Sequence, residues 1–258
     1  MIGAILAAYR ALERGPAVAG SPIPPLPWRL RGLPVCASTE LELDRWLVRL
    51  AAATAVPALP MAVLARRQRF GRGQRGRLWQ SPAGGVWISA ALPWPADPRR
   101  AAAPGLAAAV GLALQLEQLG LAVAIKWPND LLLLEEGASP GRKLAGLLPR
   151  LRLQAGAVRW ARLGLGLNGR HRPPQGAAGV PLPLPQLAAR VLLALEWAVA
   201  WAERPEAVRQ LAEARLQLPP GPVWDQGLSW QPLGLATDGG LLLGRGPQRL
   251  VLQRRFAD

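Results

Sequence analysis

The chain has 258 residues, half of them apolar, which is enough for one sizeable domain and a small second one. Its formal net charge of +15 predicts attraction to anions, but arginine recurs along the whole chain together with Ala, Gly, Pro and Leu. We therefore interpret most of this charge as compositional bias rather than as a nucleic-acid site. A single cysteine, Cys36, and a single histidine, His171, exclude an intramolecular disulfide, a zinc site and a Cys/His catalytic pair.

Nothing in the sequence indicates a membrane or secretory protein, and the cysteine usage suits the reducing cytoplasm. The first residues carry no basic group before their short apolar run, so they do not resemble a signal peptide. The apolar stretch 104–125 is interrupted by Gln115, Glu117 and Gln118, which predicts a core helix rather than a membrane span.

In chain order, we expect a helix within residues 1–20 and a proline-rich connector at 21–27. A catalytic domain of α+β class is predicted at 35–216, and a small barrel at 217–258; residues 1–34 form an N-terminal extension. The expected helices are 39–49, with Ser38 or Thr39 as N-cap, 105–119, 187–202 and 206–216; the expected strands are 61–65, 85–92, 122–126, 131–134, 144–148 and 160–167, with a basic glycine loop at 66–77.

The loop contains the letters GxGxxG at 71–76, the outline of a dinucleotide-binding fingerprint. That fingerprint requires a helix to begin at the third glycine, because the helix N-terminus holds the pyrophosphate. Pro82, Gly84 and Gly85 follow closely and prevent such a helix, so we reject the dinucleotide interpretation. The arginines of the loop favour either closure over an anionic ligand or a solvated basic surface.

Two residue types are scarce, and their positions indicate the active site. Lysine occurs only at 126 and 143, and asparagine only at 129 and 168. Because Lys and Asn are almost absent from the rest of the chain, the few that occur indicate positions where Arg or Asp could not replace them. Three of the four lie between Lys126 and Lys143, where Lys126-Trp127-Pro128-Asn129-Asp130 ends a strand abruptly and Lys143 begins another.

The combination of motifs is more specific than any one of them. Ser38-Thr39 is followed by QxxGRGxxGRxWxSP from Gln68 to Pro82, then by KWPND, KLAG and GLGLN, in this order up to Asn168. This series resembles the catalytic domain of biotin protein ligases. The segment 234–243 is similar to the C-terminal barrel of that family, usually described as SH3-like. Residues 1–34 do not resemble the DNA-binding winged helix that some members carry, so the resemblance is to the ligase-only form.

The resemblance implies the fold, the reaction and the site. The expected fold is a mixed β-sheet catalytic domain of the biotin/lipoate ligase type with a small SH3-like barrel. The expected reaction activates biotin with ATP and Mg²⁺ to biotinyl-5′-AMP and transfers biotin to a lysine of the biotin carboxyl carrier protein of acetyl-CoA carboxylase. No specific nucleic acid and no membrane is expected, and because oligomeric state varies in the family, a homodimer is one expected arrangement.

The residues that would carry this function follow from the same match. The implied catalytic residues are Lys143, Asp130 and Arg72, with Asp130 also the candidate for Mg²⁺. The implied biotin-binding residues are Ser38, Thr39, Glu40, Gln68, Arg72, Gly73, Gln74 and Lys143, and the implied ATP- or adenylate-binding residues are Arg75, Arg77, Trp79, Asn129 and Asn168.

Four departures from the family pattern leave alternatives open. Gln74 stands where the family commonly has a third arginine, Glu40 replaces an asparagine, Pro149-Arg150 replace an acidic end of the motif, and the loop from Asp130 to Lys143 is long. The alternatives are a lipoate or octanoyl ligase or transferase of the same fold, and a catalytically weak biotin-adenylate sensor. A nucleic-acid-binding protein is a third, for which no recognition module is visible.

Overall fold

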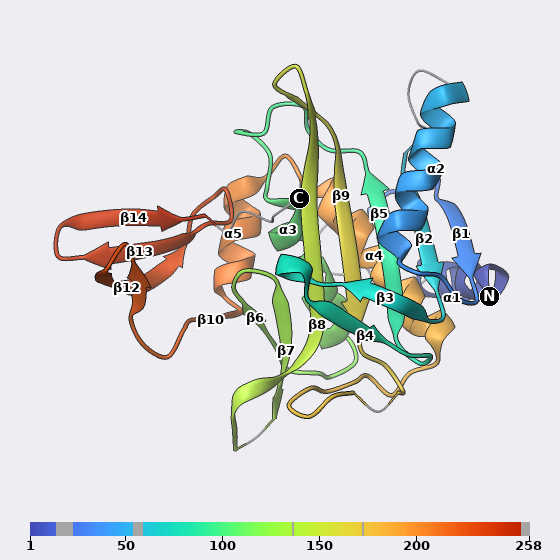
Figure 1. The fold of residues 1–258 in the computed structure, drawn as a ribbon. Helices are drawn as coiled ribbons and strands as arrows, with labels where there is room; N and C mark the ends of the chain where they lie inside the picture. Colours follow the sequence, from blue (N-terminus) through green and yellow to red (C-terminus); the bar gives the residue numbers. More distant parts are fainter. Residues whose placement is uncertain (14–22, 54–58, 136, 172, 254–258) are drawn as a thin grey trace.

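The computed structural model describes residues 1–13, 23–53, 59–135, 137–171 and 173–253. A mixed eight-stranded sheet forms the centre, with a separate four-stranded sheet at one side (Figure 1). The strand order of the large sheet is β1-β2-β5-β9-β8-β7-β6-β10, antiparallel except for the outer pairs β1–β2 and β6–β10. Its strands are β1 (Arg29–Leu33), β2 (Met61–Ala65), β5 (Val86–Leu92), β6 (Val123–Lys126), β7 (Asp130–Glu135), β8 (Ala138–Gln154), β9 (Ala157–Leu167) and β10 (Leu216–Gln217).

Helices cover one face of this sheet and form the main core with it. Prolines in the first turn begin each of α3, α4 and α5, where a missing backbone N–H costs nothing. Helix α3 is apolar on all sides and almost wholly buried, as expected for a helix enclosed between the sheet and α4. The helices are α1 (Ile2–Glu13), α3 (Pro104–Glu117), α4 (Leu184–Ala200) and α5 (Pro205–Glu213).

The opposite face of the sheet carries α2 (Thr39–Ala53) and a two-stranded hairpin (Figure 1). Leu43 and Leu47 of α2 pack against Met61 and Val63, the β2 side chains that point to this face. The hairpin consists of β3 (Gln68–Arg72), the 3₁₀ turn η1 (Gln74–Gly76) and β4 (Leu78–Ser81). The sequence predicted a loop here; cross-strand pairing gives it a defined shape, and no helix begins at Gly76.

Along β9 the two faces have different side chains. Leu163, Leu165 and Leu167 enter the helical core, whereas Gly164 and Gly166 lie on the face beneath the hairpin. This alternation follows from the two-residue period of a strand. The glycines therefore leave an open space between the sheet and the hairpin.

Most predicted elements are confirmed, with shifts at their ends; the largest is at β8, which was predicted at 144–148 and spans Ala138–Gln154. The predicted small C-terminal domain is a separate sheet, consistent with the SH3-like type, although no barrel closes among the described residues. The described strands β11 (Val223–Asp225), β12 (Leu228–Leu235), β13 (Leu241–Arg245) and β14 (Gln248–Leu252) form an open antiparallel sheet in sequence order. Trp127 joins this sheet to the large one, because its indole N–H donates to the Gly239 carbonyl at 3.0 Å.

The segment predicted as an N-terminal extension packs against the large sheet and its helices. Strand β1 pairs with β2 at the sheet edge, and α1 packs on α4. Tyr9 and Trp28 donate to the buried Glu196 carboxylate of α4 at 2.7 and 2.8 Å. No helix among the described residues is long and apolar enough to cross a membrane.

Candidate active site

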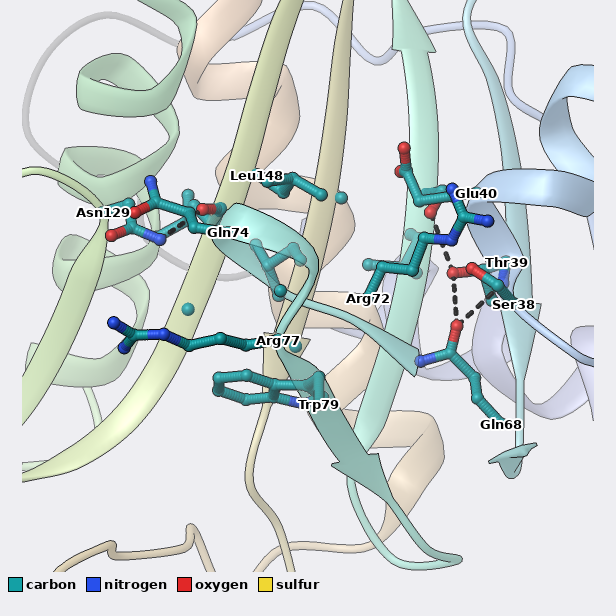
Figure 2. Close-up of a pocket in the computed structure, with 18 of the residues that line it drawn as sticks. Ser38, Thr39, Glu40, Gln68, Arg72, Gln74, Arg77, Trp79, Asn129 and Leu148 are labelled. Atoms are coloured by element: carbon teal, nitrogen blue, oxygen red, sulfur yellow. Dashed lines mark hydrogen bonds between the residues drawn. The ribbon is translucent and has the colours of Figure 1, made fainter. Parts of the chain in front are cut away.

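A cavity of about 310 Å³ lies between the large sheet, the first turn of α2 and the β3–η1–β4 hairpin. Its size suits a small organic ligand. Figure 2 shows Ser38, Thr39, Glu40 and Gln68 on one side of the cavity, and Gln74, Arg77 and Asn129 toward the other. Twelve of the residues implied by the sequence line it: Ser38, Thr39, Glu40, Gln68, Arg72, Gly73, Gln74, Arg77, Trp79, Asn129, Asp130 and Lys143.

One implied residue, Asn168, lies beside this cavity rather than in its lining. Asn168 is buried at the end of β9 and lines a neighbouring cavity of about 320 Å³, which shares Trp79 and Lys143 with the first. Its amide donates weakly to the Lys143 carbonyl, at 3.4 Å. The side chain of Arg75 lies outside the described residues.

At one end of the cavity, Gln68 organises a network of hydrogen bonds. Its Oε1 accepts from the backbone N–H of Thr39 at 2.7 Å and from Thr39 Oγ1 at 3.0 Å. Its Nε2 donates to Ser81 Oγ at 2.8 Å. Gln68 therefore satisfies a backbone N–H in the first turn of α2, which would otherwise lack a partner, and ties this helix to the hairpin.

Ser89 is a site residue that the sequence analysis missed. It lies mid-strand on β5, fully buried, and its Oγ is 2.8 Å from Thr39 Oγ1. A serine within the apolar run VWISAAL was the available signal, since a buried hydroxyl needs a partner. Arg162, also missed, forms an ion pair with Glu40 at 2.9 Å from behind the cavity wall.

At the other end of the cavity, Lys143 is held by two groups. Its Nζ lies 2.7 Å from Asp130 Oδ1 and 4.9 Å from the centre of the Trp79 ring. The ring face attracts the ammonium group through its quadrupole. Asp130 and Lys143 come together because β7 and β8 pair antiparallel; the segment that the sequence predicted as a long loop is mostly paired strand, with β7 ending at Glu135 and β8 beginning at Ala138. The ammonium group thus has a fixed position, with donors left for a ligand.

Two glycines of the large sheet leave room for the Trp79 indole, which lines the cavity. A Cβ atom at Gly166 would come within 2.6 Å of Trp79 Nε1, and one at Gly146 within 2.9 Å of the same indole. Gly146 and Gly166 are directly paired across β8 and β9. The indole therefore rests on a bare patch of backbone, which explains the alternating glycines of the GLGLN motif.

Several buried polar atoms that line the cavity lack protein partners. Among the described residues, no hydrogen bond reaches Ser38 Oγ, Glu40 Oε1, Gln74 Nε2 or Trp79 Nε1. Buried polar atoms are normally satisfied, so four unsatisfied ones around a single cavity indicate a polar ligand. Ser38 begins α2 by accepting the N–H of Glu42 on its carbonyl, which leaves its hydroxyl available to that ligand.

An α+β domain whose polar cavity contains a fixed lysine is suited to a small ligand that carries an anionic group. Residues 55–168 match the Biotin/lipoate A/B protein ligase family. The match covers β2 to β9 and therefore the hairpin, Lys143 and the glycine patch.

Two curated proteins are similar to part of this chain. The bifunctional ligase/repressor BirA of Salmonella typhimurium is 40% identical over 111 residues, 42% of this chain and 32% of that protein. The biotin–[acetyl-CoA-carboxylase] ligase of Paracoccus denitrificans is 39% identical over 121 residues, 45% of this chain and 47% of that protein. The chain thus spans about a third to a half of the length of these curated relatives.

The fold also matches a solved structure over most of its length. The biotin protein ligase from Aquifex aeolicus in complex with biotin and ATP superposes with a TM-score of 0.65 and 22% identity, over 86% of this chain and 94% of that one. The likeness in fold therefore extends beyond the segment 55–168.

Proposed function

We propose that the chain is a biotin protein ligase, which activates biotin with ATP and transfers it to a lysine of a biotin carboxyl carrier protein. One observation carries the proposal: the family's domain contains a cavity with an uncharged hydroxyl–amide network at one end and a fixed lysine at the other. Biotin has matching ends, a cyclic urea and a carboxylate.

In the first half-reaction the biotin carboxylate attacks the α-phosphorus of ATP, and pyrophosphate leaves. Lys143 stabilises the carboxylate as it approaches and the negative charge that develops on the phosphorus-bound oxygens. Asp130 and the Trp79 ring hold the ammonium group in place, so it needs no reorganisation during the reaction. Arg72 and Arg77, which line the same cavity, supply donors for the phosphates.

The nucleotide would extend from Lys143 into the neighbouring cavity that Asn168 lines, because the two cavities meet at Lys143 and Trp79. In the second half-reaction the neutral amine of the carrier lysine attacks the acyl carbon of biotinyl-AMP, an amide forms and AMP leaves. The hairpin covers the cavity and keeps water from the mixed anhydride in the meantime.

The residues present are compatible with Mg²⁺ bound jointly with ATP. No group of three or more Cys, His, Asp or Glu side chains gathers within the described residues, so a metal cage made of protein alone is not present there. Mg²⁺ characteristically uses one or two carboxylates together with substrate phosphates, and Asp130 offers one carboxylate in the cavity. Bound there, the ion would neutralise phosphate charge.

The test combines purified chain, labelled biotin, MgATP and a biotin carboxyl carrier domain. We expect ATP-dependent labelling of the carrier, with one pyrophosphate released for each biotin transferred. A carrier whose target lysine is replaced by arginine is the control and should stay unlabelled. An unlabelled wild-type carrier, or preferential transfer of lipoate or octanoate to a lipoyl domain, would contradict the proposal. The cytoplasm, where such carriers reside, is the location that the proposal implies.

A further inference from the structure

The Glu40 carboxylate lies in the cavity wall, and only one of its two oxygen atoms has a protein partner among the described residues. The residue is only 7% exposed, and its two oxygen atoms differ in their contacts. Oε2 lies 2.9 Å from Arg162 Nη2. Oε1 has no hydrogen-bond partner among the described residues and lies over Gly164, where a Cβ atom would approach it within 2.9 Å. One oxygen is thus held by the protein while the other remains available at a wall of the cavity.

The other polar groups at this end of the cavity are largely occupied with one another. Thr39, Gln68, Ser81 and Ser89 form a continuous network in which Gln68 Oε1 accepts two hydrogen bonds and its Nε2 donates one. Besides Glu40 Oε1, the buried polar atom here without a hydrogen-bond partner among the described residues is Ser38 Oγ. A hydroxyl can donate, whereas an ionised carboxylate only accepts.

Resting on the proposed function, we propose that Glu40 determines head-group specificity, by accepting a hydrogen bond from an N–H of the cyclic urea. Ser38 Oγ is free to donate to the urea carbonyl beside it. A carboxylate buried without a donor is costly, so a ligand with a dithiolane or plain alkyl head would leave Oε1 unsatisfied. The cavity therefore selects an acyl group with N–H donors and rejects lipoyl and octanoyl groups, which lack them.

Arg162 is the positioning residue for this acceptor. Its guanidinium also donates to the Glu40 carbonyl at 2.8 Å and pairs with Asp44, so three contacts fix it behind the wall. Arg72 makes no ion pair with Glu40 among the described contacts, although both line the cavity (Figure 2). Held from one side only, the carboxylate presents Oε1 to the ligand.

The test measures equilibrium binding of biotin and of lipoate without ATP, in wild type and in Glu40→Gln. The substituted amide keeps the Arg162 contact through its carbonyl oxygen and turns an NH₂ group toward the ligand's N–H. We expect biotin to bind about tenfold more weakly or worse, while lipoate binding changes by less than about threefold. Asp44→Asn is the matched control: it removes the other acidic partner of Arg162, lies outside the cavity and should leave the biotin-to-lipoate ratio unchanged.

A change in the ligand tests the same contact in the unaltered protein. Biotin methylated on its ureido nitrogens should bind to wild type with a loss at least as large as that caused by Glu40→Gln, and with little further loss in the variant. Arg162→Met should lower the ratio of biotin affinity to lipoate affinity. Arg162→Lys should keep this ratio closer to its wild-type value. If Glu40→Gln leaves the ratio of biotin affinity to lipoate affinity unchanged, this inference is overturned while the ligase proposal stays intact. Failure of wild type to bind biotin would overturn both.

Discussion

At the scale of single residues, Lys143 is fixed by an acidic group on one side and an aromatic ring on the other. The Asp130 carboxylate is 2.7 Å away, and the Trp79 ring centre 4.9 Å. An ammonium group can donate three hydrogen bonds, so Asp130 leaves capacity for a substrate carboxylate. This arrangement explains why a lysine persists here in a chain that uses arginine nearly everywhere else.

We expect Lys143→Ala to reduce adenylate formation by about 10²–10³-fold, the usual loss when one oxyanion-stabilising donor is removed. Lys126→Ala removes the other lysine, which is exposed at the end of β6, and should leave the rate unchanged. Pyrophosphate release in the presence of biotin and MgATP measures both. Near-normal release by Lys143→Ala would contradict the role given to this residue.

Gln74 offers a second prediction at this scale. Its Nε2 is buried at the cavity without a partner among the described residues. A guanidinium at this position could make a charge-assisted bond to the adenylate, worth about 1.5–3 kcal/mol against about 1 kcal/mol for a neutral bond. Gln74→Arg should therefore slow the escape of biotinyl-AMP several-fold, as measured by trapping the released adenylate. Equal off-rates would show that another group retains the intermediate.

At the scale of elements, the glycines of β9 and β8 allow the Trp79 indole to lie close against the sheet. In Gly166→Ala the new methyl group would meet Trp79 Nε1 at 2.6 Å, so the indole must move away from Lys143. We expect a loss of about 1–3 kcal/mol in the free energy of unfolding, as is usual for overpacking, together with a raised KM for ATP. Gly221→Ala, where nothing lies within 4 Å, is the control. Unfolding curves and steady-state kinetics check both variants.

The junction of α1 with α4 predicts a pH dependence. Glu196 is 3% exposed, and burial raises the pKa of its carboxyl despite the donors Tyr9, Leu26 and Trp28. The folded state then holds this proton to higher pH than the unfolded state, whose carboxyl titrates near pH 4.3. Its contribution to stability is complete below that pH and is lost as the pH rises through the raised pKa. Denaturation curves over this range should show a falling stability that Glu196→Gln flattens; parallel slopes in the two proteins would contradict it.

Elements could be predicted from the sequence where their pattern is local. The strand at Met61–Ala65 is a bounded apolar run, and α3 begins at a proline and is apolar up to Leu114. The hairpin was predicted as a loop, because its glycines and arginines carry no strand pattern and only pairing of β3 with β4 orders it. Strand β1 was missed for a similar reason: it is parallel to β2, and that pairing joins distant segments.

The candidate-site residues also divide into those indicated by local motifs and those that only the pairing of distant strands brings to the site. Lys143, Asp130 and Ser38, which line the cavity, were implied by motifs. Ser89 and Arg162 were missed because each lies mid-strand, and its relevance depends on sheet register: β5 and β9 place both residues beside the first turn of α2. Register between distant strands cannot be read from a single strand's own letters.

At the scale of the whole molecule, the large sheet and the C-terminal sheet are connected by specific polar contacts. Trp127 donates to the Gly239 carbonyl, and Glu213 of α5 accepts the backbone N–H of Leu235 at 2.8 Å. The second contact joins α5 to the end of β12, and the first reaches the turn between β12 and β13. The division of the chain at residue 217 stays a proposal, with these contacts holding the two parts together.

The net charge of +15 gives the last prediction. Arginines distributed over many elements should cause weak retention on any duplex DNA at low ionic strength, because counterion release favours it. Little retention should remain near about 0.15 M salt, and no sequence should be preferred. Competition against random duplex decides the point, since specific binders typically keep a preference of about 10³ or more. Such a preference would contradict the interpretation of the charge as compositional.

The Lys143–Asp130 pair also bears on self-labelling. An enzyme that makes an activated acyl group exposes its own amines to acylation, and this chain contains only two lysines. One of them, Lys143, lies 2.7 Å from the Asp130 carboxylate and lines the cavity, so its amine is not free to attack an acyl group. Lys126 is then the remaining lysine on which stray acylation can fall. Under the proposed function, self-labelling of lysine would therefore fall on Lys126 rather than on Lys143.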